Sequence, residues 1–129
     1  MNESELWKKM KERLRLDMLS RVENKIESGW PDVFYTHNKK SGWIELKVER
    51  KFPSRIKFQK AQPNWLHDYA KIGTCYVMLY VEIDNLIYIW DGKDARELNK
   101  DGGPSGIKPL LWFTCDREGF DYMYIKLFI

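Results

Sequence analysis

The chain has 129 residues, of which 43% are hydrophobic and 32% are charged, and its formal net charge at neutral pH is +3. This length and composition predict a globular protein with a core of its own and exclude a disordered chain. No run of about 18 apolar residues occurs, which excludes a transmembrane helix, and the acidic N-terminus does not resemble a secretory signal. Cys75 and Cys115 lack metal-ligand spacing, so we expect two free thiols.

The positive charge is concentrated between residues 39 and 60. This stretch has a net charge of +6, whereas the rest of the chain sums to −3. A local basic surface favours a polyanionic partner, because each Lys or Arg that contacts a phosphate releases counterions. On charge alone, a solvated lysine-rich loop explains the stretch equally well. Its basic residues are Lys39, Lys40, Lys47, Arg50, Lys51, Arg55, Lys57 and Lys60.

The N-terminal half predicts one helix followed by short strands. Leu6, Trp7 and Met10 recur at the spacing of one helical face, which indicates an amphipathic helix over residues 3–15. After it, we expect a short strand around residues 21–23, a strand over 32–35, a turn over 37–42 and a strand over 43–48 that completes a hairpin.

The second half predicts a basic loop, a helix and further strands. Residues 75–81 form an almost unbroken apolar run, typical of a strand buried on both faces. The whole order indicates an α/β fold with a central mixed β-sheet and flanking helices. We expect one domain over 1–129, with a core over about 3–92 and a C-terminal extension over 93–129. The other expected elements are a loop over 49–57, a helix over 62–71, a strand over 86–90, a helical turn over 94–98, a mobile loop over 99–106, and peripheral strands over 110–113 and 122–129.

Asp32, Glu45 and Lys47 are the candidate site. Strand alternation places Glu45 and Lys47 on one face, and Asp32 begins the neighbouring strand. Two converging carboxylates suit Mg²⁺, which lowers the pKa of bound water and neutralises phosphate charge. Lys47 would orient or deprotonate that water, or stabilise negative charge. The Glu-x-Lys triplet alone is better explained as a charged stripe on a strand, but the second acid one strand upstream favours the metal site.

The segment Gly29-Trp30-Pro31-Asp32, followed after twelve residues by Glu45-Leu46-Lys47, resembles the PD-(D/E)XK nuclease superfamily. Over residues 3–81 the chain is similar to its small VRR-NUC and Holliday-junction-resolvase-like members, which phages often encode. The resemblance implies a restriction-endonuclease-like core of order αβββαβ and a DNA endonuclease dependent on Mg²⁺ or Mn²⁺. It also implies that Asp32, Glu45 and the Leu46 carbonyl are metal ligands and that Lys47 is the catalytic base or charge stabiliser.

The resemblance further implies an acid from the first helix and a glutamine from the helix after Glu-x-Lys. Glu3 fits the first as an additional metal ligand, with Glu5 and Glu23 as the other candidates. An acid that merely favours the helix dipole is an equal explanation of Glu3. Gln62 fits the catalytic glutamine better than Gln59, although both also suit a surface amide.

Other polar residues have simpler explanations. Arg21 and Glu23 are either DNA-facing residues or strand-edge charges, and the second explanation is the safer one. His37 and His67 have no Cys or His neighbours at ligand spacing, so we expect surface or half-buried residues. The Trp and Tyr residues offer stacking surfaces but are more simply core residues.

The expected partner is DNA. We expect the protein to act in the cytoplasm of a bacterium or of a phage-infected host cell. Junction resolvases of this type act as pairs, which suggests a homodimer, and an edge strand at Tyr122–Ile129 would offer a pairing surface. A DNA-binding module that has lost its chemistry and a small interaction protein are the alternatives. The predicted DNA-binding residues are Lys39, Lys40, Arg50, Lys51, Arg55, Lys57 and Lys60.

Overall fold

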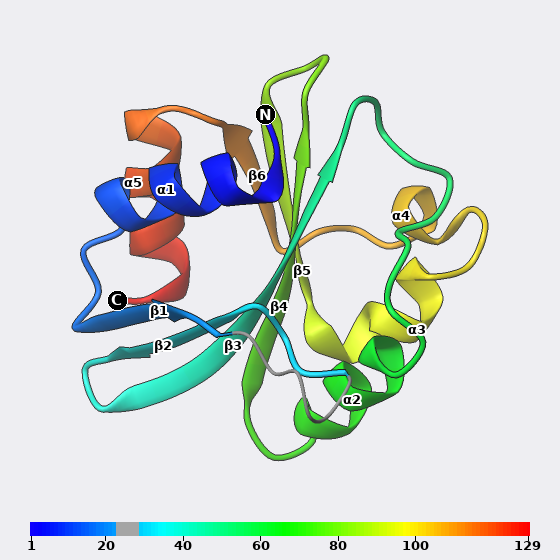
Figure 1. The fold of residues 1–129 in the computed structure, drawn as a ribbon, viewed down its shortest axis with the longest axis horizontal. Coiled ribbons are helices and arrows are strands. Elements are labelled where there is room, and N and C mark those ends of the chain that lie inside the picture. Colours follow the sequence, from blue (N-terminus) through cyan, green and yellow to red (C-terminus); the bar gives the residue numbers. More distant parts are fainter. Residues whose placement is uncertain (23–28) are drawn as a thin grey trace.

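The computed structural model describes residues 1–22 and 29–129, which form an α/β fold around a six-stranded sheet (Figure 1). No helix in these two ranges is long and apolar enough to cross a membrane. In chain order the elements are α1 (Glu3–Arg13), β1 (Met18–Arg21), β2 (Val33–His37), β3 (Lys40–Glu49), α2 (Gln62–Tyr69), β4 (Thr74–Val81), β5 (Leu86–Asp91), the 3₁₀ turn η1 (Gly92–Asp94), α3 (Ala95–Leu98), α4 (Gly103–Gly106), β6 (Leu111–Thr114) and α5 (Arg117–Leu127).

The strands lie in the sheet in the same order as in the chain, from β1 to β6. The β3–β4 pair is parallel and the other four pairs are antiparallel, so the sheet is mixed. A parallel pair needs a crossover connection, and α2 is part of it. The order α1–β1–β2–β3–α2–β4 is the αβββαβ order expected from the sequence, and the predicted fold class is confirmed.

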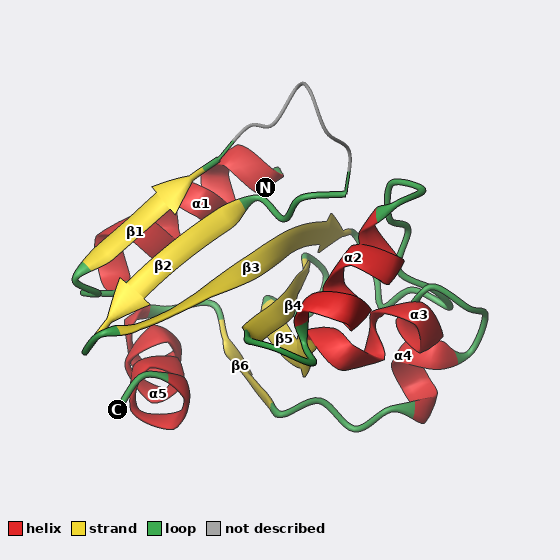
Figure 2. Cartoon of the chain, turned by 90° about the horizontal axis from the view of Figure 1, so that it is seen from below, coloured by secondary structure: helices red, strands yellow, loops and turns green. Residues whose placement is uncertain are grey.

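Helices cover both faces of the sheet (Figures 1 and 2). On one face, Leu6 and Met10 of α1 and Phe120 of α5 belong to the same buried cluster as Ile44 and Leu46 of β3. On the other face, residues of α2 and α3 pack against alternate residues of β4. The predicted burial of β4 on both of its faces is thereby confirmed, as is the prediction of two free cysteines, both of which are buried.

The β2–β3 hairpin is tighter than expected. Its turn consists of Asn38 and Lys39, both with left-handed backbone (φ 52° and 65°), and β3 already begins at Lys40. The predicted turn over 37–42 is therefore wrong at both ends, because a two-residue turn of this hand matches the twist of the strands. Gly42 is a strand residue, and a Cβ there would lie 2.6 Å from the Thr74 carbonyl oxygen.

The C-terminal tail is helical, although the sequence predicts a strand. Most residues of the predicted edge strand form the second half of helix α5. This helix begins after Asp116, and the Asp116 carboxylate accepts a hydrogen bond from the Gly119 N–H at 2.8 Å. Phe120 and Met123 are buried at the three-residue spacing of a helical face. The tail therefore offers no strand edge for pairing two chains.

Two smaller differences concern β1 and the predicted mobile loop. Strand β1 lies at Met18–Arg21 and not at 21–23, and Glu23 is outside the described residues. The stretch from 99 to 106 contains the helical turn α4, where Pro104 is buried and the Gly102 N–H donates to the Ser54 carbonyl at 2.7 Å. Beyond residue 92, β6 pairs with β5 and α5 completes a core cluster.

The burial pattern of α5 predicts the cost of truncating its side chains. We expect Phe120→Ala to lower the free energy of unfolding by about 3–5 kcal/mol, because it removes a fully buried ring. Ile125→Ala, on the same helix but 59% exposed, should change it by less than about 0.5 kcal/mol. Urea unfolding of both variants measures the difference, and equal losses would contradict the assignment of these two faces.

Candidate active site

The pairing of β2 with β3 brings Asp32 and Glu45 together. Val33 is the register partner of Ile44, so the residues that flank this pair, Asp32 and Glu45, are neighbours on one face of the sheet. The Asp32 N–H donates to Glu45 Oε1 at 3.2 Å, and the Leu46 N–H donates to Asp32 Oδ2 at 3.1 Å. Each carboxylate is thus bound to main chain of the other strand, which fixes both of them.

The chain before Asp32 is also held in place. Gly29 has φ 98°, a backbone conformation that favours glycine, and a Cβ there would lie 3.1 Å from the Cβ of Ala61. Pro31 is buried, and the Asp32 carbonyl accepts a hydrogen bond from the Val22 N–H at 2.7 Å. The Gly-x-Pro-Asp segment therefore has a local structural role, which is to deliver the Asp32 carboxylate to the start of β2.

Lys47 lies on the same face of β3 and contacts Glu45. Its Nζ is 3.2 Å from Glu45 Oε2 and lies 5.0 Å from the centre of the Phe58 ring. The Glu45 side chain is only 2% exposed and that of Lys47 is 16% exposed. The ammonium is consequently confined between a buried carboxylate and an aromatic face.

Gln62 is the third contact of this ammonium. Its Oε1 is 3.5 Å from Lys47 Nζ and accepts a hydrogen bond from the Gln59 N–H at 3.0 Å. Gln62 is the first residue of α2 and is buried, whereas Gln59 is exposed. The structure therefore brings Gln62, and not the Gln59 side chain, to the lysine.

Burial and neighbouring acidic charge raise the pKa of two acids in this region, Glu45 and Glu3. Burial raises the pKa of Glu45 to about 8, the charge of Asp32 and to a lesser degree of Glu3 adds to the rise, and Lys47 opposes it. The pKa of Glu3 is also raised, first by burial and then by Asp32, while Lys47 and Arg21 lower it. Glu3 therefore belongs to the same electrostatic cluster, although it comes from α1. The cluster thus holds three acids and two basic groups, Lys47 and Arg21, a composition that leaves room for an additional cation.

The donor set fits a hard divalent cation only in part. Among the described residues, no group of three or more His, Cys, Asp and Glu side chains is arranged to hold a metal ion. The Asp32 charge nevertheless acts on Glu45, which places the two carboxyl groups near each other, and Mg²⁺ commonly uses one or two carboxylates with water and phosphate oxygens completing its shell. Leu46 lies between Glu45 and Lys47 with its side chain in the opposite core, and a ligand role for its carbonyl stays a prediction.

The predicted DNA-binding residues fall into two groups. Lys39 and Lys40 lie at the hairpin turn, and Lys40 is five residues before Glu45, roughly 17 Å away along the strand. The others are exposed in the loop between β3 and α2, which is anchored where the Ile56 N–H donates to the Leu98 carbonyl at 2.8 Å. That loop group consists of Arg50, Lys51, Arg55, Lys57 and Lys60.

The remaining candidates lie elsewhere. Arg21 donates to the Ser4 hydroxyl at 3.0 Å, and Glu5 is exposed on α1. His37 is buried and its Nε2 is 2.9 Å from the Tyr124 hydroxyl, while His67 Nδ1 is 3.3 Å from the Lys93 carbonyl. None of these side chains has a hydrogen bond or ion pair with Asp32 or Glu45 in the described residues. His67 is half-buried as expected, whereas His37 is buried, because it packs against Tyr124 of α5.

The sequence analysis missed an aromatic cluster beside the carboxylates. The rings of Trp30, Trp43 and Trp65 pack with centroids 5.3 to 5.9 Å apart. Two of them adjoin the site directly in sequence, since Trp30 precedes Pro31-Asp32 and Trp43 lies two residues before Glu45 on the same face. These spacings were a readable signal, whereas nothing in the sequence pointed to Phe58, which reaches Lys47 from a loop.

Comparison with known proteins finds similarity to solved structures. No protein-family profile and no curated protein matches the sequence. Among solved structures, the chain is similar to Hjc, a Holliday junction resolvase from the archaeal hyperthermophile Archaeoglobus fulgidus, with 19% sequence identity, a TM-score of 0.46 and coverage of 70% of each chain. At this TM-score and identity the similarity carries no argument about fold family or activity.

The raised pKa of Glu45 predicts how stability depends on pH. Between its ordinary pKa of 4.5 and its folded value of about 8, the folded protein holds a proton that the unfolded chain releases. The contribution of this proton to the free energy of unfolding is therefore complete below pH 4.5. It is lost as the pH rises to 8, by at most about 1.4 kcal/mol per pH unit. Glu45→Gln should lack this loss.

The measurement is urea unfolding of metal-free protein between pH 5 and 9. The free energy of unfolding of Glu45→Gln should rise relative to that of the unmodified chain across this range. Glu118→Gln, at an exposed position, is the control, and its free energy of unfolding should depend on pH in the same way as that of the unmodified chain. A Glu45→Gln protein with this same pH dependence would contradict the proposed burial of a protonated carboxyl.

Proposed function

We propose that the protein is a divalent-metal-dependent DNA endonuclease of the PD-(D/E)XK type, VRR-NUC-like, which hydrolyses phosphodiester bonds. The observation that carries the proposal is the meeting of the Asp32 and Glu45 carboxylates beside the Lys47 ammonium. Burying a carboxylate next to a second one costs free energy and has no benefit for packing. Such an arrangement is typical of a functional site.

Asp32 and Glu45 would hold Mg²⁺ or Mn²⁺, with Glu3 as a further acid close enough to affect their charge. By the family likeness, the Leu46 carbonyl would complete the protein ligands. When bound, the ion would acidify a water molecule and neutralise negative charge on the phosphate. The raised pKa of Glu45 makes its deprotonation a condition for holding the cation, so affinity for the metal should increase with pH.

Lys47 would act on the reacting phosphate or on the attacking water. Its Nζ is held by Glu45 Oε2 and Gln62 Oε1 and is shielded by Phe58. A positioned ammonium in a half-buried site stabilises developing negative charge without reorganisation of solvent. Gln62 is accordingly a positioning residue, because it acts through the lysine.

DNA would be bound through its phosphates by the basic loop after β3 and by the hairpin turn. These two groups lie toward opposite ends of β3, with Glu45 and Lys47 between them. This separation supports the narrower proposal of a substrate whose strands diverge at the site, such as branched DNA. The segment expected to supply a pairing edge for a homodimer belongs to helix α5, so it does not support pairing of two chains through a strand.

Asp32→Asn and Lys47→Met should each lower Mg²⁺-dependent cleavage by about 100-fold or more while leaving the fold intact. Asn retains an oxygen that can accept the Leu46 N–H but removes the charge that a cation requires. The assay compares a four-way junction, a flapped duplex and plain duplex DNA with Mg²⁺ or Mn²⁺. Lys71→Met, at an exposed position after α2, is the matched control and should cleave normally.

Undiminished cleavage by pure Asp32→Asn protein would contradict the proposal. The competing function is a DNA-binding module on the same fold without chemistry. It predicts salt-sensitive binding of DNA by the unmodified chain, with no cleavage of any of the three substrates and no uptake of Mn²⁺ in a titration.

A further inference from the structure

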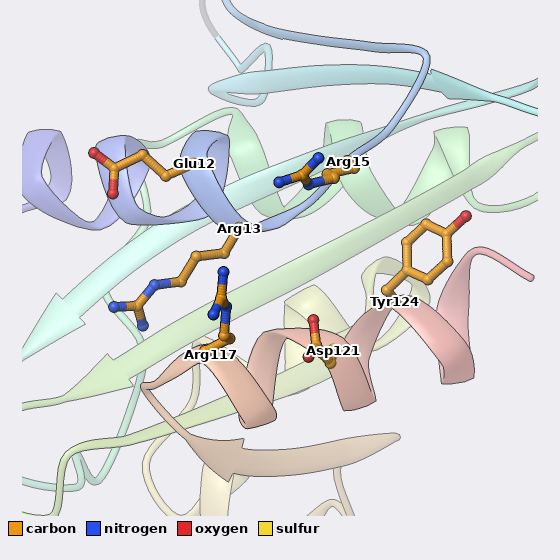
Figure 3. A pocket seen from close by; sticks show the side chains of 6 residues that line it. All are labelled: Glu12, Arg13, Arg15, Arg117, Asp121 and Tyr124. Carbon is orange, nitrogen blue, oxygen red and sulfur yellow. The ribbon is translucent and has the colours of Figure 1, made fainter.

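A second polar site lies between α1 and α5, on the face of the sheet opposite to the Glu45 and Lys47 side chains. It is a cavity of about 760 Å³ beside the end of α1 (Figure 3). A volume of this size is sufficient for a small-molecule ligand. The residues that line it are Glu12, Arg13, Arg15, Arg117, Asp121 and Tyr124.

Three of these six residues are arginines, and they come from both sides of the cavity. Figure 3 shows Arg13 pointing down from the end of α1, Arg15 on the segment that follows α1, and Arg117 rising from α5. Within the described ranges, no carboxylate forms an ion pair with any of the three guanidinium groups, the lining acids included. The three guanidinium groups thus have no direct ion pair in the described ranges, and with Glu12 and Asp121 the lining carries a formal charge of +1.

One of these groups is also buried without a hydrogen-bond acceptor. Nη1 of Arg13 is inaccessible to solvent, and the described part of the chain provides no partner for it. Buried polar atoms nearly always have a partner, and a charged donor without one is a particularly unfavourable case. Arg13 thus lines the cavity while its Nη1, which solvent does not reach, has no acceptor in the described part of the chain.

Two of the lining side chains, Arg13 and Tyr124, are held by contacts with the core. The Arg13 guanidinium lies over the Phe120 ring at 5.9 Å, and Phe120 is fully buried. The Tyr124 hydroxyl is 2.9 Å from His37 Nε2, which ties its ring to the end of β2. These side chains are therefore held by the core before any ligand arrives.

We propose that this cavity binds a nucleotide through its phosphate group. The planar fork of a guanidinium matches phosphate oxygens in pairs, and several converging arginines favour a group with more than one negative charge. The Asp121 carboxylate points into the same space in Figure 3 and is an acceptor suited to a sugar hydroxyl. The phosphate would belong either to a free nucleotide or to the 5′ end of a DNA strand.

This inference is independent of the proposed endonuclease activity, because no residue is shared with the carboxylate cluster. The test is therefore made without metal, in the presence of a chelator. The probes are inorganic phosphate, AMP, ATP, and one oligonucleotide with either a 5′-phosphate or a 5′-hydroxyl. Binding is followed by amide chemical shifts and by calorimetry at low salt.

We expect AMP or the 5′-phosphorylated oligonucleotide to bind and to shift amide signals of residues around the cavity. Arg117→Gln and Arg13→Gln should each weaken binding at least ~10-fold, the usual cost of one charge-assisted contact. Arg117 is exposed, so its variant keeps the test valid if Arg13→Gln unfolds. Lys126→Gln, which removes the same charge from an exposed position of α5, should bind like the unmodified chain.

The same experiment distinguishes a free nucleotide from the 5′ end of a DNA strand. Preference for AMP or ATP over the phosphorylated strand identifies a free nucleotide, and preference for the 5′-phosphate over the 5′-hydroxyl strand identifies a strand end. Binding of inorganic phosphate without any nucleotide, the absence of binding at millimolar concentration, or unchanged affinity in Arg117→Gln would each overturn the proposal.

Discussion

The register between β2 and β3 is the constraint on which the candidate active site depends. With Val33 opposite Ile44, the Asp32 and Glu45 carboxylates share one face and each accepts a hydrogen bond from main chain of the other strand. A slip of one residue would move the side chains of one strand to the other face and separate the two acids. The tight turn at residues 38 and 39 fixes this register, since a two-residue loop leaves no slack.

The candidate site could be predicted from the sequence because its residues lie in regular strands. Alternation alone placed Glu45 with Lys47, and the hairpin placed Asp32 beside them. What escaped prediction came from long-range packing. Phe58 belongs to an irregular loop, and the arginine-lined cavity joins the end of α1 to α5, segments separated by about a hundred residues. No local pattern encodes such contacts.

The same distinction explains the errors in the fold. The uninterrupted apolar run of β4 was recognised because burial on both faces leaves an unmistakable signature. In residues 122–129 the apolar residues are as dense, but exposed ones such as Ile125 and Ile129 hide the helical period of Phe120 and Met123. The decisive signal was Asp116 as a helix cap, one turn earlier.

The order of the strands has a consequence for how the protein is made. Every strand pairs with the one that precedes it in the chain, so the sheet grows at one edge as synthesis proceeds and never waits for a distant partner. The acidic pair is complete once the ribosome has released β3, yet Lys47 gains its amide partner only when α2 emerges with Gln62. In the order of synthesis, both acids therefore precede the glutamine that contacts the lysine.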